Sequence, residues 1–179
     1  RRRRRDGFLA VACPYRRTVW KRHDRAAAGI AHMSDLKLTW NEWGADAAVE
    51  GHDLALEDGL ATAVILSLFL DARARADDAL PDGGTDRRGF WADTVAPAAE
   101  RDRMGSRLWL LSREKTLPEV LRRAHDYAAE ALRWLVDDGV ASRVDVSAAM
   151  PRLGLLSLAV NITLVNGESS TYAFSYPLE

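Results

Sequence analysis

The histidines are the first side chains to test for chemistry, because histidine most often serves as a general base near neutral pH. They are His23, His32, His52 and His125. Only His52 and His125 are followed directly by a carboxylate, in Asp53 and Asp126. Neighbouring residues on a helix or strand point to different sides, so neither pair forms a dyad by itself. We interpret His125 as a solvated residue on the polar side of a helix.

Carboxylates offer a second chemistry, because a glycosidase needs two of them facing each other across the scissile bond. The sequence is compatible with a pair of Asp93 and either Glu57 or Asp58, but no motif selects that pair. The acidic runs at residues 77–78 and 82–86 lack the ligand period and terminal Glu of a calcium loop. We interpret these runs as solubilising loops and expect no metal site.

Other catalytic motifs are missing from the sequence. Gly83-Gly84 lacks the spacing and the following Lys of a phosphate-binding loop, and there is no Gly-x-Ser-x-Gly. The single cysteine, Cys13, excludes an internal disulfide and disfavours a thiolate metal site. The sequence therefore predicts a protein that is not an enzyme and holds no cofactor.

A charged loop that ends in aromatic residues is the strongest candidate for a binding site. Glycines at residues 83, 84 and 89 surround Arg87 and Arg88, and Phe90 and Trp91 follow directly. Arg and Trp are residue types that anchor protein–protein interfaces. Burial statistics instead favour a solvated loop whose aromatic side chains fold back into the core. The sequence leaves both interpretations open.

The charge distribution divides the chain at Met33. Residues 1–32 hold ten Arg or Lys and two Asp or Glu, which leaves 15 basic and 24 acidic residues in the remainder of the 179-residue chain. An acidic body argues against nucleic-acid binding. We expect residues 1–32 to be a basic N-terminal extension, disordered or non-native, with the natural start at Met33. A basic arm that contacts nucleic acid or an acidic partner is the other interpretation.

Two apolar stretches are predicted to build the core. Leu60 to Leu70 is too short to cross a bilayer, which needs about 20 residues, and apolar residues cover most of its helical circumference. We therefore predict a buried central helix with Asp58 as its N-cap. Gly105 to Leu111 is predicted to be a short helix or turn that packs on it.

The longest helix is predicted over residues 117–138. Thr116-Leu117-Pro118-Glu119 fits a capping box, and Gly139 fits a C-terminal stop. Between them, apolar residues recur with helical spacing on one face. They are Leu117, Val120, Leu121, Ala124, Ala128, Ala131, Leu132 and Leu135.

Alternation with a period of two predicts strands before and after the helices. Leu36 to Trp40 and Val49 to Leu56 are expected to be strands, with a turn at residues 41–44. In the C-terminal third, turns at residues 151–154 and at Asn166-Gly167 separate three alternating stretches. These are Val144 and Val146, then Leu156, Leu158, Val160, Ile162 and Leu164, then Tyr172, Phe174 and Tyr176.

This element order predicts an α+β fold in a single domain, residues 33–179. Two main helices pack on a small, mostly antiparallel sheet, and a β-meander ends the chain.

Several short sequence blocks, taken in their order along this domain, resemble a known family. They are Asp53-Leu54-Ala55-Leu56, Asp58-Gly59-Leu60-Ala61-Thr62-Ala63-Val64, Leu80-Pro81-Asp82, residues 86–93, residues 105–111 and Asp138-Gly139-Val140-Ala141. This order resembles the Mu-type bacteriophage tail baseplate proteins, which are similar in turn to the small baseplate wedge protein of contractile-tailed phages. The resemblance covers residues 33–179 and omits residues 1–32.

The resemblance implies a structural role in the inner baseplate, in several copies around the tail axis. The implied partners are the larger baseplate wedge protein, the tail hub or spike, the tube and the sheath. We expect no membrane contact. The implied location is the virion tail baseplate, after synthesis in the bacterial host cytoplasm. An association of the wider family with lysozyme activity keeps a peptidoglycan hydrolase as the alternative.

The resemblance also extends the predicted partner interface beyond the charged loop. The wider wedge family carries a Glu-Pro-Arg pattern after its second helix, and only Arg143 matches that pattern here. The predicted interface comprises Arg87, Arg88, Phe90, Trp91, Arg107, Trp109 and Arg143.

Overall fold

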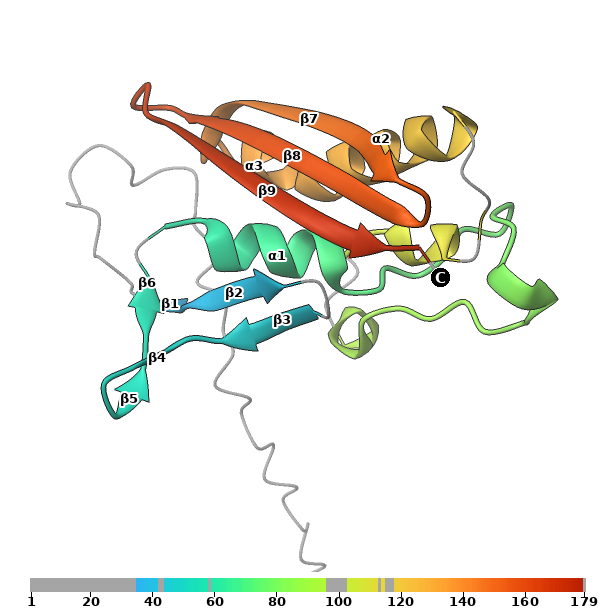
Figure 1. The fold of residues 1–179 in the computed structure, drawn as a ribbon, viewed down its shortest axis with the longest axis horizontal. Coiled ribbons are helices and arrows are strands. Elements are labelled where there is room, and N and C mark those ends of the chain that lie inside the picture. Colours follow the sequence, from blue (N-terminus) through green and yellow to red (C-terminus); the bar gives the residue numbers. More distant parts are fainter. Residues whose placement is uncertain are drawn as a thin grey trace, which may run out of the picture. The chain divides into compact units, whose positions relative to one another are not determined.

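The computed structural model describes residues 35–41, 44–57, 59–95, 103–112, 114 and 118–178. All of them belong to one compact unit, Ser34–Glu179, which has the predicted α+β fold (Figure 1). The expected N-terminal extension, the predicted N-cap Asp58 and the capping-box residue Thr116 lie outside the described residues.

Helix α1 (Ala61–Phe69) is the predicted central helix. Val64, Ile65 and Leu68 are buried, as expected for a helix that is apolar on most of its circumference. The residue before the helix, Leu60, makes no side-chain cap. Instead, the carboxylate of Glu57 accepts a 2.6 Å hydrogen bond from the backbone amide of Thr62, which satisfies one free amide of the first turn.

The predicted long helix is divided into α2 (Pro118–Leu132) and α3 (Trp134–Asp137). The interruption falls at Arg133, whose amide bonds the carbonyl of Glu130 three residues back. Gly139 ends α3 as predicted, with φ +67°, because a residue without a side chain adopts this left-handed conformation freely. The amide of Val140 then bonds the carbonyl of Leu135 and closes the helix terminus.

The C-terminal meander is confirmed. Strands β7 (Ala141–Arg152), β8 (Leu155–Leu164) and β9 (Ser169–Pro177) form an antiparallel sheet in the order β7-β8-β9. The tight turn between β8 and β9 holds the predicted Asn166-Gly167, with Gly167 at φ +90°. The first predicted turn is shorter than expected, because β7 continues through Pro151 to Arg152.

The N-terminal strands differ in part from the prediction. The alternation from Leu36 to Trp40 does form strands, β1 (Asp35–Leu36) and β2 (Leu38–Asn41), and β2 pairs with β3 (Gly44–Ala47). The expected single strand Val49 to Leu56 is wrong. It forms a hairpin of β4 (Val49–Glu50) and β5 (Asp53–Leu54), and then β6 (Leu56–Glu57), which pairs with β1. Gly51, at φ +66°, allows the chain to reverse.

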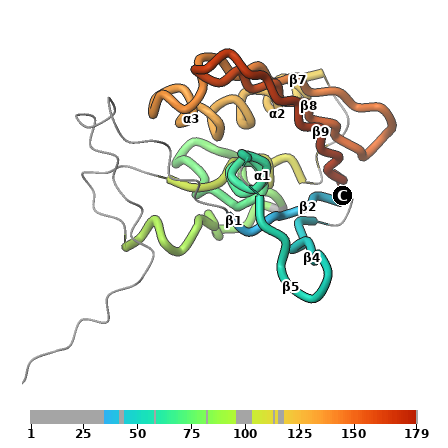
Figure 2. Tube along the Cα trace, turned by 90° about the vertical axis from the view of Figure 1, so that its left-hand side faces the viewer, coloured from blue at the N-terminus to red at the C-terminus, as the bar shows by residue number. Residues whose placement is uncertain are grey.

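Helix α1 lies between the β2–β3 ribbon and the meander, as Figures 1 and 2 show. Trp40 of β2 stacks on Phe69 of α1 with ring centroids 3.5 Å apart, and its indole Nε1 donates a 2.7 Å hydrogen bond to the carbonyl of Ser175 in β9. Phe69 also contacts Phe174 edge-on at 5.4 Å. These rings join the ribbon, the helix and the meander. Among the described residues, no helix combines the length and apolar character needed to span a membrane.

Candidate partner-binding site

The charged loop leaves the core after α1, and its two ends meet in a short parallel β-bridge. Asp71 forms a parallel bridge with Ser106. The amide of Ala72 donates to the carbonyl of Ser106 (2.9 Å), and the amide of Ser106 donates to the carbonyl of Leu70 (2.8 Å). Gly105 has φ +96°, and a Cβ there would lie 2.4 Å from the Leu70 oxygen. Only glycine fits this closure, because any side chain would collide with the backbone of α1's end.

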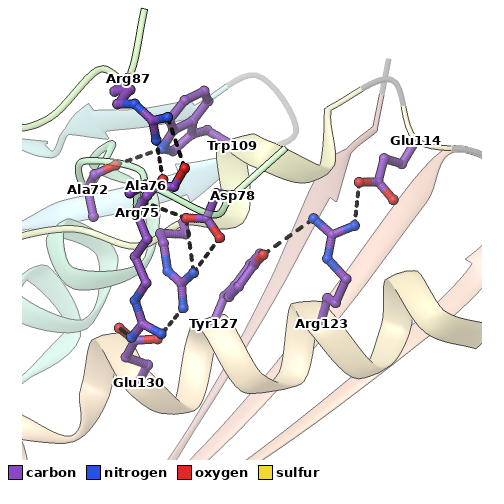
Figure 3. Close-up of polar contacts among 11 residues, drawn as sticks. Ala72, Arg75, Ala76, Asp78, Arg87, Trp109, Glu114, Arg123, Tyr127 and Glu130 are labelled. Carbon is purple, nitrogen blue, oxygen red and sulfur yellow. Dashed lines mark hydrogen bonds and ion pairs between the residues drawn. The ribbon is translucent and has the colours of Figure 1, made fainter. Parts of the chain in front are cut away.

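Arg87 holds this loop together from the inside. Its guanidinium donates hydrogen bonds to the carbonyl oxygens of Arg75 and Ala76, the latter at 3.1 Å (Figure 3). The backbone of Arg87 also accepts a 2.9 Å bond from the amide of Ala74. Two of the guanidinium nitrogens of Arg87 are therefore already hydrogen-bonded to the backbone of the loop.

Arg88 connects the loop to the core through Trp109. Its guanidinium lies 4.5 Å from the centroid of the indole ring and 2.9 Å from the carboxylate of Asp71. Arg88 adopts φ +45°, and it is the one non-glycine residue with positive φ among the described residues. A fixed left-handed backbone and two side-chain contacts together define the direction of the chain that follows.

Trp109, which the sequence assigns to the interface, is buried. It belongs to the short 3-10 helix η3 (Leu108–Leu111), which confirms the predicted helix or turn in this stretch. The tryptophan is only 4% exposed, and its Nε1 donates a 2.8 Å bond to the carbonyl of Ala72. Its ring thus belongs to the core, with its one polar atom satisfied internally.

Arg107 is also a structural residue. Its side chain is 10% exposed, bonds Asp78 at 2.8 Å and Glu130 at 2.6 Å, and lies 4.4 Å from the ring of Tyr127. Although burial opposes the charge on Arg107, the carboxylates of Glu130 and Asp78 outweigh it and raise its pKa. Burial likewise opposes ionisation of Asp78, but the amide of Arg75 and the Arg107 guanidinium outweigh it and lower the pKa of that carboxyl.

Sequence reasoning missed the three partners of Arg107, namely Asp78, Tyr127 and Glu130. One local signal was present, because residues three apart on a helix share a face, and Tyr127 and Glu130 have that spacing. The ends of this network come from the loop, from the residue before η3 and from α2 (Figure 3). It therefore fixes the loop to the long helix.

The residues after Arg88 form an apolar group, which we call the Trp91 corner: the exposed Trp91 and Val95 and the half-buried Phe90. Trp91 is 69% exposed, so the interpretation that places this ring in the core is wrong. The 3-10 helix η2 (Trp91–Thr94) holds the corner through 3.1 Å backbone bonds from Asp93 to Phe90 and from Val95 to Ala92. The rings of Phe90 and Trp91 lie 5.7 Å apart. A large indole thus stands in solvent on an ordered turn.

Arg143 lies away from this corner. It projects from β7, is exposed and pairs with Asp145, whose carboxylate is 2.7 Å from Nε. Both views place β7 and η2 in separate parts of the unit (Figures 1 and 2). Of the seven predicted interface residues, the structure gathers Arg87, Arg88, Phe90, Trp91, Arg107 and Trp109 around one loop and leaves Arg143 elsewhere.

The candidate catalytic residues have structural partners. His125 and Asp126 are closer than expected for neighbouring residues, with Nδ1 and Oδ1 3.1 Å apart, and both are exposed, as predicted for His125. Asp93 accepts a 3.3 Å bond from the amide of Met104, and Glu57 caps α1 as described above. Over the described ranges, no group of three or more His, Cys, Asp or Glu is arranged to hold a metal ion.

Comparison with known proteins identifies the family to which the chain belongs. Residues 60–169 match the model of the family described as Phage protein GP46, and the chain belongs to this family. The chain is 46% identical to the Baseplate protein gp46 of Escherichia phage Mu over 143 residues, which cover 79% of this chain and 95% of that protein. It is 40% identical to the Mu-like prophage FluMu protein gp46 of Haemophilus influenzae over 142 residues, or 79% and 96% of the two chains. The resemblance to Mu-type baseplate proteins is confirmed.

Proposed function

We propose that this protein is a structural component of a phage tail baseplate and acts through protein–protein contacts. The observation that carries the proposal is the 46% identity to the Baseplate protein gp46 of phage Mu along 95% of its length. Identity at this level along nearly a whole relative supports a shared fold and a shared place in an assembly.

The finer proposal is that the protein joins the larger wedge protein to the hub or spike, the tube and the sheath, in several copies per baseplate. The Trp91 corner supports it. A tryptophan on a rigid turn loses little conformational freedom when a partner covers it, and such residues often dominate binding energy. Arg87 and Arg88, which precede this turn, anchor its start through their bonds to Ala76 and Asp71. Arg143 on β7 is a second candidate contact.

The Trp91→Ala substitution tests the corner. Because Trp91 is 69% exposed, we expect the isolated protein to stay folded, with an unfolding free energy within about 0.5 kcal/mol of the wild type. Incorporation into purified tails should fall about tenfold or more, the effect of losing a typical hot-spot residue. Leu153→Ala, at an 85% exposed position in the turn after β7, is the matched control. An unfolded Trp91→Ala protein, or tails that incorporate it normally, would count against the corner.

The location is tested on particles. We expect mass spectrometry of purified tails to find the protein in the baseplate fraction, after its synthesis in the host cytoplasm, and we expect deletion of its gene to stop baseplate assembly. Normal tails from the deletion strain would refute the proposed function. The hydrolase alternative gains no support from Glu57 or Asp93, since each carboxylate accepts a backbone bond.

A further inference from the structure

The hairpin of β4 and β5 presents aliphatic side chains to solvent. Val49, Leu54 and Leu56 are 69%, 52% and 63% exposed, and we call them the hairpin patch. Val49 lies directly opposite Leu54 in the β4–β5 pair, so their side chains share one face. Leu54 and Leu56 flank Ala55, which is buried, so the two leucines face away from the core. The patch thus joins three aliphatic residues of neighbouring strands.

Acidic residues are frequent in the strands that carry this patch and in the strands next to them. Between residues 35 and 57, the described residues carry five acidic side chains and one lysine, Lys37. The five are Asp35, Asp46, Glu50, Asp53 and Glu57. Four of them accept backbone amide bonds at 2.6–2.8 Å. In the part of the chain that the structure describes, none of the five forms an ion pair with Arg, Lys or His. The negative charge around the hairpin patch is therefore not neutralised within the described unit.

The base of the hairpin is fixed by backbone bonds. The amide of Lys37 donates to the carbonyl of Ala55 (2.9 Å), and the carbonyl of Lys37 accepts from the amide of Ala48 (2.9 Å). The amide of Ala55 closes the set by donating to the carbonyl of Ala48 (2.8 Å). The hairpin projects from the β2–β3 ribbon in both views, away from η2 (Figures 1 and 2). A fixed base orients the patch before any partner binds, which lowers the entropic cost of binding.

Charge decides which occupant fits. Glu50 and Asp53 are exposed and lie opposite each other, next to Val49 and Leu54. A symmetric contact between two copies of this hairpin would bring these carboxylates together, and like charges across an interface are repulsive. Aliphatic residues flanked by such carboxylates instead complement aliphatic residues flanked by cations.

We propose that the β4–β5 hairpin is a second docking surface, which takes a partner protein that presents aliphatic side chains ringed by Arg and Lys. This inference rests on the proposed assembly role and adds the chemistry of one partner. It involves no residue of the Trp91 corner.

The test uses the full chain, tagged and supplied in trans to a phage or prophage strain without its gene. The apolar variant is Val49→Ser with Leu54→Ser, and its matched control is Leu153→Ser with Val165→Ser, at turn positions that are 85% and 67% exposed. The readout is the number of tagged copies per purified tail, measured by quantitative mass spectrometry. We expect control incorporation to equal that of the wild type and apolar-variant incorporation to fall about tenfold or more.

A second variant tests the charge without touching the aliphatic residues. Glu50→Lys with Asp53→Lys reverses two exposed charges at the turn of the hairpin, and we expect a comparable loss of incorporation. Thermal unfolding of each purified variant shows whether it folds as the wild type does. If the apolar variant does not fold, the charge variant decides.

A photo-crosslinking amino acid at position 54 identifies the occupant. We expect a crosslink to an Arg- and Lys-rich peptide of another tail protein. A crosslink to a second copy of this chain or to an acidic peptide would overturn the proposal, as would normal incorporation of both folded hairpin variants. Absence of the wild-type chain from purified tails would instead refute the proposed function, and this inference with it.

Discussion

Arg107 is the residue whose loss should most weaken the attachment of the charged loop to helix α2. The change is Arg107→Ala. It removes both ion pairs, to Asp78 and to Glu130, and the contact with the ring of Tyr127. Among the described residues, the exposed pair of Arg75 and Glu130 would then remain as the ionic contact between the loop and α2.

The magnitude follows from the burial of the two ends. The side chains of Arg107 and Asp78 are 10% and 11% exposed, so removing the cation leaves a largely buried carboxylate without its guanidinium. Breaking a buried pair in this way costs about 3–5 kcal/mol. Glu130 is 47% exposed and keeps a second partner in Arg75 at 2.6 Å, so its contribution is small. We expect the free energy of unfolding to fall by about 3 kcal/mol at neutral pH.

The pH dependence of that loss has a definite sign. The folded protein lowers the pKa of Asp78, partly through Arg107, so the carboxylate stabilises the fold above its unfolded pKa of about 3.9. That stability is lost as the pH falls through the lower, folded pKa. The difference between wild type and Arg107→Ala should be constant above about pH 5 and should narrow below about pH 4.

Urea unfolding followed by tryptophan fluorescence, from pH 7 down to about pH 3, measures both effects. Arg122→Ala is the control, because Arg122 pairs with Glu119 on the surface of α2 with exposures of 63% and 58%. Exposed pairs of this kind contribute little to stability, because solvent screens the two charges. A loss at Arg107 as small as that at Arg122, or one that does not change with pH, would refute the reasoning.

Two further predictions concern the backbone and the aromatic cluster. Gly105→Ala places a Cβ 2.4 Å from the carbonyl oxygen of Leu70 and should reduce the unfolding free energy by about 3 kcal/mol or more, whereas Gly51→Ala, with nothing within 4 Å, should cost about 1 kcal/mol. Equal losses in urea unfolding at the two glycines would contradict the steric argument. Trp40→Phe keeps a ring on α1 but removes the 2.7 Å bond to the carbonyl of Ser175, and calorimetry should show a loss of about 1–2 kcal/mol; no change in the melting temperature would show that water replaces that bond.

Local rules predicted the elements that depend on local chemistry. The turn at Asn166-Gly167 and the end of the long helix at Gly139 both follow from positive φ, which a glycine accepts wherever it occurs. The one-sided burial of β8 follows from its period of two. The single strand expected over residues 49–56 shows the limit of such rules. The chain reverses at Gly51, so its two halves pair with each other instead of continuing as one strand.

The candidate site was harder to predict, because its contacts join residues far apart in sequence. Arg and Trp are residue types common at interfaces, yet Arg107 and Trp109 are largely buried by partners far away in the sequence. The spacing of Tyr127 and Glu130 shows that these two share a helix face, but it does not show that Arg107 packs there. Composition pointed to the Phe90-Trp91 stretch as a candidate, but it could not distinguish a ring in solvent from a ring in the core. The hairpin patch was not predicted from the sequence, because Val49 lies opposite Leu54 only after the chain reverses at Gly51.

The bridge between Asp71 and Ser106 brings the two ends of the charged loop together. The segment between these two positions therefore begins and ends at neighbouring points of the fold. A segment of different length or sequence can therefore be accommodated between them, provided that Gly105 and the partner of Arg107, Asp78, are kept. Transplanting the segment from the Haemophilus prophage relative into this chain, with these two residues retained, should accordingly give a stable chimaera with altered compatibility.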